Sequence, residues 1–228
     1  MLRLVTSYIR IIAKKIEDIG VSEILKDMKT RYNTEVVKGT NPEYVKKLYE
    51  ALQKLPEQLV KDCKITSMGF EDLGPSKEFY PNHGKYSKGV LTLNERIMDD
   101  PKMEEAPDGK RMSKFFQTYY HELFHGLDEK RKSEDSWLSL KDDWLSLSGW
   151  SEEPKPGLKR LVIREKGAPE LKGEWYYSPS AKFARFYAKR SPWDDFADHG
   201  SYWVGGLKSM VPKEKREYFD KLLKEYYE

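Results

Sequence analysis

Residues 111–128 read RMSKFFQTYYHELFHGLD, the most informative stretch of the chain. We predict a helix here with aromatic residues on more than one face, which indicates a largely buried position. His121 and His125 are four residues apart, so both imidazoles lie on one face of this helix and can bind one metal ion. Two of the four histidines of the chain fall within these five residues. The alternative is a pair of buried, hydrogen-bonded histidines beside an exposed Glu122.

The residue types of this segment fit hydrolytic zinc chemistry. Zn²⁺ bound by two histidines and a carboxylate keeps its fourth position open for water. The ion lowers the pKa of that water toward about 7 and polarises a carbonyl group. Glu122 follows the first histidine directly, where its carboxylate can take the proton of the water and pass it to a leaving amine. The predicted cofactor is therefore Zn²⁺.

Residues 191–199, SPWDDFADH, provide the candidates for a third ligand. Pro192 predicts the start of a helix, and Asp194 and Asp198 share one face of it because they are four residues apart. This spacing suits one carboxylate that binds the metal and a second that orients a ligating histidine. The alternative is ordinary helix chemistry, since acidic residues are favoured in a first turn.

Residues 121–128, HELFHGLD, together with residues 187–198, YAKRSPWDDFAD, resemble the gluzincin zinc metallopeptidases of the anthrax lethal-factor-like family. That family pairs HExxH with a later helix carrying Glu-x-Phe-Ala-Glu, and a tyrosine stands seven residues before the first of these glutamates. Tyr187 stands seven residues before Asp194. The resemblance implies that Asp194 is the third zinc ligand and Asp198 the carboxylate behind a ligand. It also implies that Tyr187 donates a hydrogen bond to the developing oxyanion.

The chain departs from this pattern because aspartates replace both glutamates. Aspartate is one methylene shorter, so either the helix must approach more closely or the ion must shift. Asp198 and His199 therefore stay alternative ligands to Asp194. Tyr187 also follows Phe183 and Phe186, and aromatic residues at this spacing are typical of a core.

The remaining sequence indicates one mixed α+β chain. Strand-like stretches are residues 64–70, 86–94, 158–165 and 173–178, and residues 99–110 are predicted to form a polar loop. The resemblance implies a zincin-like domain with a small twisted sheet, whose edge strand lines the cleft. We assign this edge to 86–94 (YSKGVLTLN), so that a peptide substrate adds near Val90 to Leu93. His83, in the loop before it, is expected to be solvent-exposed.

We predict a helical extension over residues 1–55, ahead of a catalytic domain over residues 56–228. Its first helix carries a regular apolar stripe of Leu2, Val5, Ile9, Ile12, Ile16 and Ile19. We expect this face to pack against the same domain. Self-association of two copies through it is the alternative, although two and a half heptads are a short seam.

Composition excludes several classes of protein. Lys and Arg number 41 and Asp and Glu 38, with both signs mixed throughout, which argues against a nucleic-acid partner. The chain lacks an apolar run long enough to cross a membrane and a recognisable signal peptide, so we expect a cytoplasmic protein. Four asparagines and three glutamines, set against abundant Lys and Glu, match the composition of heat-adapted proteins.

These observations predict a zinc metallopeptidase that acts on a peptide or protein substrate. In this prediction His121, His125 and Asp194 bind the ion, and Glu122 and Tyr187 carry out the chemistry. The alternative is a catalytically impaired protein that keeps the scaffold and works as a binding or regulatory module, which the two aspartate replacements favour.

Overall fold

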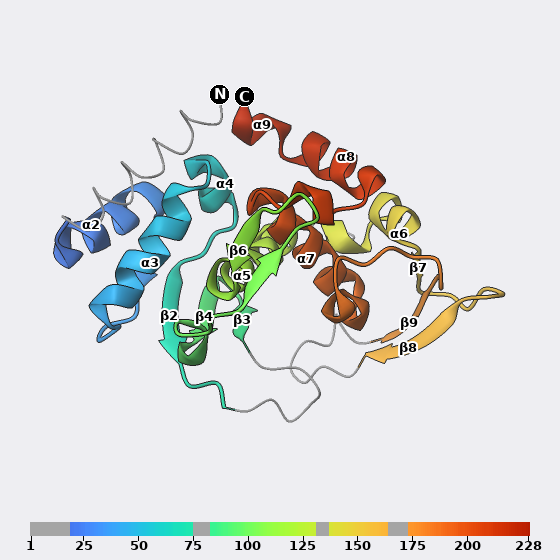
Figure 1. Cartoon of the computed structure of the whole chain (residues 1–228), viewed down its shortest axis with the longest axis horizontal. Coiled ribbons are helices and arrows are strands. Elements are labelled where there is room, and N and C mark those ends of the chain that lie inside the picture. The colour runs from blue at the N-terminus through green and yellow to red at the C-terminus, as the bar shows by residue number, and fades with distance from the viewer. Residues whose placement is uncertain (1–18, 75–82, 131–136, 164–172) are drawn as a thin grey trace.

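The computed structural model describes residues 19–74, 83–130, 137–163 and 173–228 (Figure 1). The predicted N-terminal helix, apart from Ile19, lies outside these residues. Helices and small sheets are mixed along the described chain, which confirms the α+β class. None of the described helices is both long enough and apolar enough to span a bilayer.

The α-helices of the described chain are α2 (Val21–Tyr32), α3 (Pro42–Gln53), α4 (Glu57–Asp62), α5 (Lys114–Lys130), α6 (Asp142–Ser148), α7 (Pro192–Val204), α8 (Lys213–Leu222) and α9 (Lys224–Tyr227). Short 3₁₀ helices are η1 (Glu95–Ile97), η2 (Leu138–Leu140), η4 (Phe186–Arg190) and η5 (Lys208–Met210). The strands are β1 (Glu35–Val36), β2 (Ser67–Glu71), β3 (Gly84–Ser87), β4 (Val90–Asn94), β5 (Met103–Glu105), β6 (Arg111–Ser113), β7 (Trp150–Ser151), β8 (Lys159–Ile163) and β9 (Gly173–Tyr177).

The largest sheet has the strand order β1-β2-β4-β3. Strands β1, β2 and β4 run parallel, whereas β3 pairs antiparallel with β4. The predicted single strand over residues 86–94 is therefore wrong. Lys88 and Gly89 have φ angles of 48° and 83° and form a tight hairpin turn between β3 and β4. The edges of the sheet are β1 and β3, and the predicted edge residues Val90 to Leu93 lie in β4, which is paired on both sides.

Helix α5 packs against this sheet and begins later than predicted. Residues 111–113 are strand β6, which pairs with β5, so part of the predicted polar loop 99–110 is also a strand. Gly126 lets the helix approach its neighbours closely. A Cβ atom there would lie 3.0 Å from the carbonyl oxygen of Cys63 and 3.2 Å from the ring of Tyr86.

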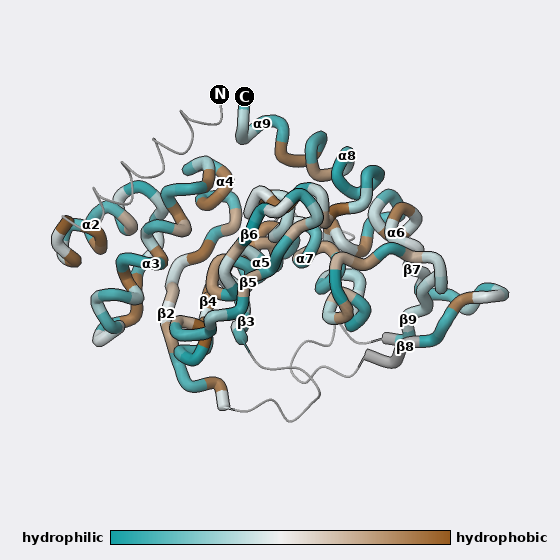
Figure 2. Tube along the Cα trace, in the orientation of Figure 1, coloured by the Kyte–Doolittle hydropathy of each residue, from teal (hydrophilic) through white to brown (hydrophobic). Residues whose placement is uncertain are grey.

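One apolar core joins most of the described chain. It includes Ile24 and Leu48 from the N-terminal helices, Leu91 from the sheet, Phe124 from α5 and Phe219 from α8. Apolar positions recur along α3, α5 and the strands of the main sheet in Figure 2. The part of the predicted extension 1–55 that is described thus shares this core, and it supplies strand β1 to the sheet.

A second, smaller sheet with the order β7-β9-β8 lies at the opposite end of the molecule from α2 and α3 (Figure 1). Its strands β8 and β9 match the predicted stretches 158–165 and 173–178 to within a few residues. Trp150, Trp175 and Trp193 form a separate buried cluster. Because Trp193 belongs to α7, this cluster anchors the start of that helix.

Helix α7 is buried along nearly its whole length and packs on α5. Ser191 caps its first turn, where its side-chain oxygen accepts a hydrogen bond from the backbone N–H of Asp194, and Pro192 occupies the first helical position. Gly200 faces the ring of Phe124 so closely that a Cβ atom would overlap it. The α5–α7 contact therefore depends on this glycine.

We predict that Gly200→Ala destabilises the protein by about 1–3 kcal/mol, because the added methyl group overpacks the contact with Phe124. Alanine in a helix interior otherwise stabilises by about 0.5–1 kcal/mol relative to glycine. Chemical denaturation measures the free energy of unfolding. Gly20→Ala, at the N-cap of α2, serves as a control for the added methyl group, since among the described residues a Cβ atom there meets the Ser22 hydroxyl alone, at 3.9 Å. A Gly200→Ala variant as stable as the wild type would contradict this account of the contact.

Candidate metal centre

The structure brings the three predicted ligands together between α5 and α7. The two Nε2 atoms of His121 and His125 are 3.0 Å apart. The Oδ1 atom of Asp194 lies 3.6 Å from Nε2 of His121 and 3.8 Å from Nε2 of His125. A tetrahedral zinc ion with bonds of about 2.0–2.1 Å separates its ligand atoms by roughly 3.3 Å. The three donor atoms therefore already have the spacing that one ion requires.

Asp194 reaches this position despite its short side chain because α7 packs directly against α5. Its second oxygen, Oδ2, accepts a hydrogen bond of 2.6 Å from the hydroxyl of Ser191, and its backbone N–H donates to the same residue. Ser191 therefore fixes the rotation of the carboxylate and leaves Oδ1 directed at the two histidines.

Asp198 lies behind His121 rather than among the three donor atoms. Its Oδ1 atom accepts a hydrogen bond of 2.7 Å from Nδ1 of His121. This bond places the proton of the neutral imidazole on Nδ1 and leaves the lone pair of Nε2 for a metal. The placement matches the role that the resemblance implies for Asp198.

His199, weighed as an alternative ligand, points away from the site. Its Nδ1 atom lies 2.8 Å from the backbone oxygen of Asp195 and 2.9 Å from a side-chain oxygen of the same residue. Asp195 also accepts hydrogen bonds from Nζ of Lys215, at 2.9 and 3.0 Å, and from the indole of Trp150. His199 and its partner Asp195 thus lie on a different face of α7 from Asp194. His199 is therefore not among the residues whose donor atoms converge.

Glu122 is buried between α5 and the edge strand. A Cβ atom on Gly84 of β3 would lie 2.9 Å from the Glu122 side chain and 2.9 Å from Thr118, so glycine is required for this close approach. The backbone N–H of Tyr86 donates to the carboxylate. Burial raises the pKa of Glu122 to about 7, with the nearby carboxylates adding to the effect. A carboxylate with this pKa is well matched to accepting a proton near neutral pH.

Tyr187 lies beside the first histidine. Its ring centroid is 5.5 Å from that of His121, and the two rings meet edge to face. Its hydroxyl oxygen accepts a hydrogen bond of 2.7 Å from Arg190. Tyr187 belongs to the 3₁₀ helix Phe186–Arg190, just before α7.

The pKa values of the two histidines shift in opposite directions. Burial disfavours the charged form of both, yet the carboxylates of Asp198 and Asp194 outweigh it at His121 and raise its pKa above the ordinary value. At His125 burial dominates and lowers the pKa. Burial likewise opposes ionisation of Asp198, but Arg185 and His121 hold the pKa of this carboxyl well below its usual range. A metal ion bound at these atoms would therefore displace a proton mainly from His121.

Several residues at the site were not predicted from the sequence. Ser191 could have been found, because serine before proline is a common start of a helix. Arg185 and Arg190 flank the ring of Tyr187, with guanidinium carbons 4.9 and 4.8 Å from its centroid. Neither arginine belongs to a local sequence pattern that would predict a contact with Tyr187. His83, expected to be solvent-exposed, is half-buried.

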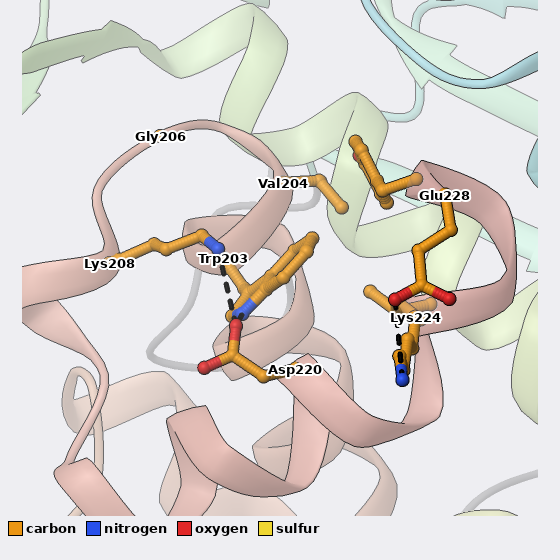
Figure 3. A pocket seen from close by; sticks show the side chains of 9 residues that line it. Trp203, Val204, Gly206, Lys208, Asp220, Lys224 and Glu228 are labelled. Carbon is orange, nitrogen blue, oxygen red and sulfur yellow. Dashed lines mark hydrogen bonds and ion pairs between the residues drawn. The ribbon is translucent and has the colours of Figure 1, made fainter.

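A pocket of about 400 Å³ at the C-terminal end of α7 holds none of these residues (Figure 3). Trp203 donates its indole N–H to Asp220 at 2.9 Å, and the amine of Lys208 lies 3.6 Å from the centroid of the indole ring. This pocket is distinct from the group of donor atoms between α5 and α7.

Comparisons of the chain with family models, with curated proteins and with solved structures give no match. The assignment of the site therefore rests on its geometry and on the chemistry of its residues.

Asp128, three residues after His125, is expected to make the stability of the fold depend on pH. It is fully buried; its Oδ1 atom accepts the backbone N–H of Ser139 at 3.0 Å, and its Oδ2 atom has no hydrogen-bond partner among the described residues. Burial raises the pKa of Asp128 to about 7. The folded state therefore binds more protons than the unfolded state between about pH 4 and pH 7, and stability falls as the pH rises through this window.

We predict that Asp128→Asn removes this part of the pH dependence. The variant is expected to gain stability relative to the wild type between pH 4 and pH 8, by on the order of a few kcal/mol. Urea denaturation of metal-free protein across this range measures the difference. Asp99→Asn, an exposed position, controls for the loss of one charge. A constant difference between Asp128→Asn and wild type would show that Asp128 does not titrate in this window.

Proposed function

We propose that this protein is a zinc-dependent peptidase with a zincin-like active site. The observation that carries the proposal is the convergence of two imidazole nitrogens and one carboxylate oxygen within 3.8 Å of one another. Two histidines and a carboxylate form a typical ligand set of catalytic zinc sites. When bound, zinc supplies an electrophile that polarises the scissile carbonyl and acidifies a water molecule.

Glu122 acts as the general base in this proposal. Its carboxylate is buried next to the donor atoms, and its raised pKa suits it to take a proton from water and return it to the leaving amine. The hydrogen bond from Tyr86 and the contact with Gly84 hold the carboxylate in place. The edge strand therefore positions the base as well as bordering the site.

The substrate is proposed to pair with β3. Strand β3 hydrogen-bonds to β4, and Asn94 donates to the backbone oxygen of His83. In antiparallel pairing, alternate residues direct their backbone groups away from the partner strand. Because His83 is bonded to β4, Gly84 and Tyr86 direct their backbone groups away from β4. The N–H of Tyr86 donates to Glu122, so the backbone groups of Gly84 and the carbonyl of Tyr86 are the ones proposed to pair with a peptide. An extended peptide added to this edge would lie beside Glu122.

Tyr187 is proposed to donate its phenolic O–H to the oxyanion that forms at the scissile carbonyl. A phenol oxygen that accepts one hydrogen bond can also donate its own proton. The bond from Arg190 orients this hydroxyl and increases its donor strength by placing a positive charge nearby.

We predict that Glu122→Gln abolishes hydrolysis while zinc binding is retained, because glutamine cannot accept the proton of water and Glu122 is not a ligand. Peptide libraries and unfolded protein serve as substrates, with and without a chelator, and zinc content is measured on the same samples. Activity that survives both metal removal and Glu122→Gln would contradict the proposal. A wild-type protein that binds zinc but cleaves nothing would instead favour a binding or regulatory module.

We predict that Tyr187→Phe lowers kcat by about 10²–10³-fold and leaves zinc affinity unchanged, since it removes one oxyanion donor. Steady-state kinetics on a peptide identified as above measures the effect. Tyr176→Phe, on the separate β9 strand, is the matched control. An unchanged kcat in Tyr187→Phe would assign Tyr187 to packing instead.

A further inference from the structure

Arg185 makes the most extensive charged contact at the site, although it touches none of the three donor atoms. Its backbone is extended, with φ −153° and ψ 175°, just before the 3₁₀ helix Phe186–Arg190. From there its guanidinium spans to α7, where Nε lies 2.8 Å from Oδ2 of Asp198 and Nη2 lies 2.6 Å from Oδ1. Such a two-bond fork fixes the plane of a carboxylate as well as its position.

The carboxylate of Asp198 also accepts hydrogen bonds from two side chains of α5. Oδ1 of Asp198 accepts the 2.7 Å hydrogen bond from Nδ1 of His121 and a longer one, of 3.4 Å, from the side-chain amide of Gln117. Asp198 is fully buried. A buried carboxylate without a cation would be strongly disfavoured as an anion. The charge that His121 relies on therefore depends on Arg185.

We propose that Arg185 is a positioning residue: by fixing Asp198, it holds the Nδ1–H of His121 in place so that Nε2 faces Asp194 and His125. This inference rests on the proposed function, because it assigns those three donor atoms to a metal. The guanidinium also lies 4.9 Å from the ring centroid of Tyr187. A single side chain thus links the support of a metal ligand to the proposed oxyanion donor.

Helix α7 offers a matched control for a lost buried cation. Lys215 pairs with Asp195 on another face of the helix, with both bonds to this carboxylate near 3 Å and both side chains almost fully buried. Its amine also donates to the backbone oxygen of Lys182, at 2.9 Å. Replacing Lys215 removes a buried ion pair from the same helix without touching His121. A general loss of α7 stability is thereby separated from a loss of support for the histidine.

The experiment compares wild type, Arg185→Met, Arg185→Lys and Lys215→Met. Zinc affinity is measured by competition with a chromophoric chelator, and thermal unfolding is measured on metal-free protein. We expect Arg185→Met to weaken zinc binding by about 10–100-fold, the usual effect of losing a partner behind a ligand. Arg185→Lys restores the affinity only in part, because lysine has the charge but not the fork. Lys215→Met is expected to lose stability and to keep wild-type zinc affinity.

A second readout does not need the metal. In metal-free protein labelled with ¹⁵N-histidine, the Nδ1–H proton of His121 should exchange slowly with solvent in wild type and Lys215→Met, and rapidly in Arg185→Met. Equal zinc affinities in Arg185→Met and wild type, or an Nδ1–H signal unaffected by the substitution, would overturn the proposal. If wild type itself binds no zinc, the proposed function fails, while the exchange measurement still decides the role of Arg185. Should Arg185→Met not fold, Arg185→Lys carries both tests.

Discussion

The hydrogen bond between Asp198 and His121 is the interaction on which the rest of the site depends. It joins α5 to α7 at 2.7 Å in a fully buried position and sets which nitrogen of His121 faces the other donors. Close packing makes this bond possible, because Gly200 lets α7 approach Phe124 of α5. The short aspartate side chains at 194 and 198 are therefore compatible with a metal centre: the helix backbones have come close enough to make up for the missing methylene.

Of the three buried carboxylates of helix α7, Asp195 and Asp198 are each paired with a cation, on different sides of the helix. Asp198 is paired with Arg185 and faces the histidines, whereas Asp195 is paired with Lys215 and Trp150 and faces the other side. Each charge has a cation within 3 Å, so each is compensated where water is excluded. Ion pairs thereby hold the helix on two sides. His199 lies on the side of Asp195 and contacts that residue, whereas Asp194 lies on the side of His121 and His125.

The sequence predicts the parts of the site that follow local rules. The spacing of His121 and His125 requires only that their segment is helical, and Ser191-Pro192 marks where α7 begins. It does not predict the edge of the sheet, because Lys88-Gly89 forms a turn in which lysine stands where asparagine or aspartate would have signalled it. Arg185 and Gly84 could not be predicted either. Their importance lies in contacts with Asp198 and Glu122, which belong to other elements of the fold and are not part of any periodic pattern around Arg185 or Gly84.

His121, His125 and Asp194 are proposed to bind one metal ion between α5 and α7. Titration of metal-stripped protein with Zn²⁺, comparing wild type with Asp194→Ala, tests this proposal most directly. We expect one zinc ion per wild-type chain and a much weaker site in Asp194→Ala, with loss of binding when His125 is also replaced. Wild-type protein that takes up no zinc, or an Asp194→Ala variant that binds it as tightly as wild type, would contradict the claim.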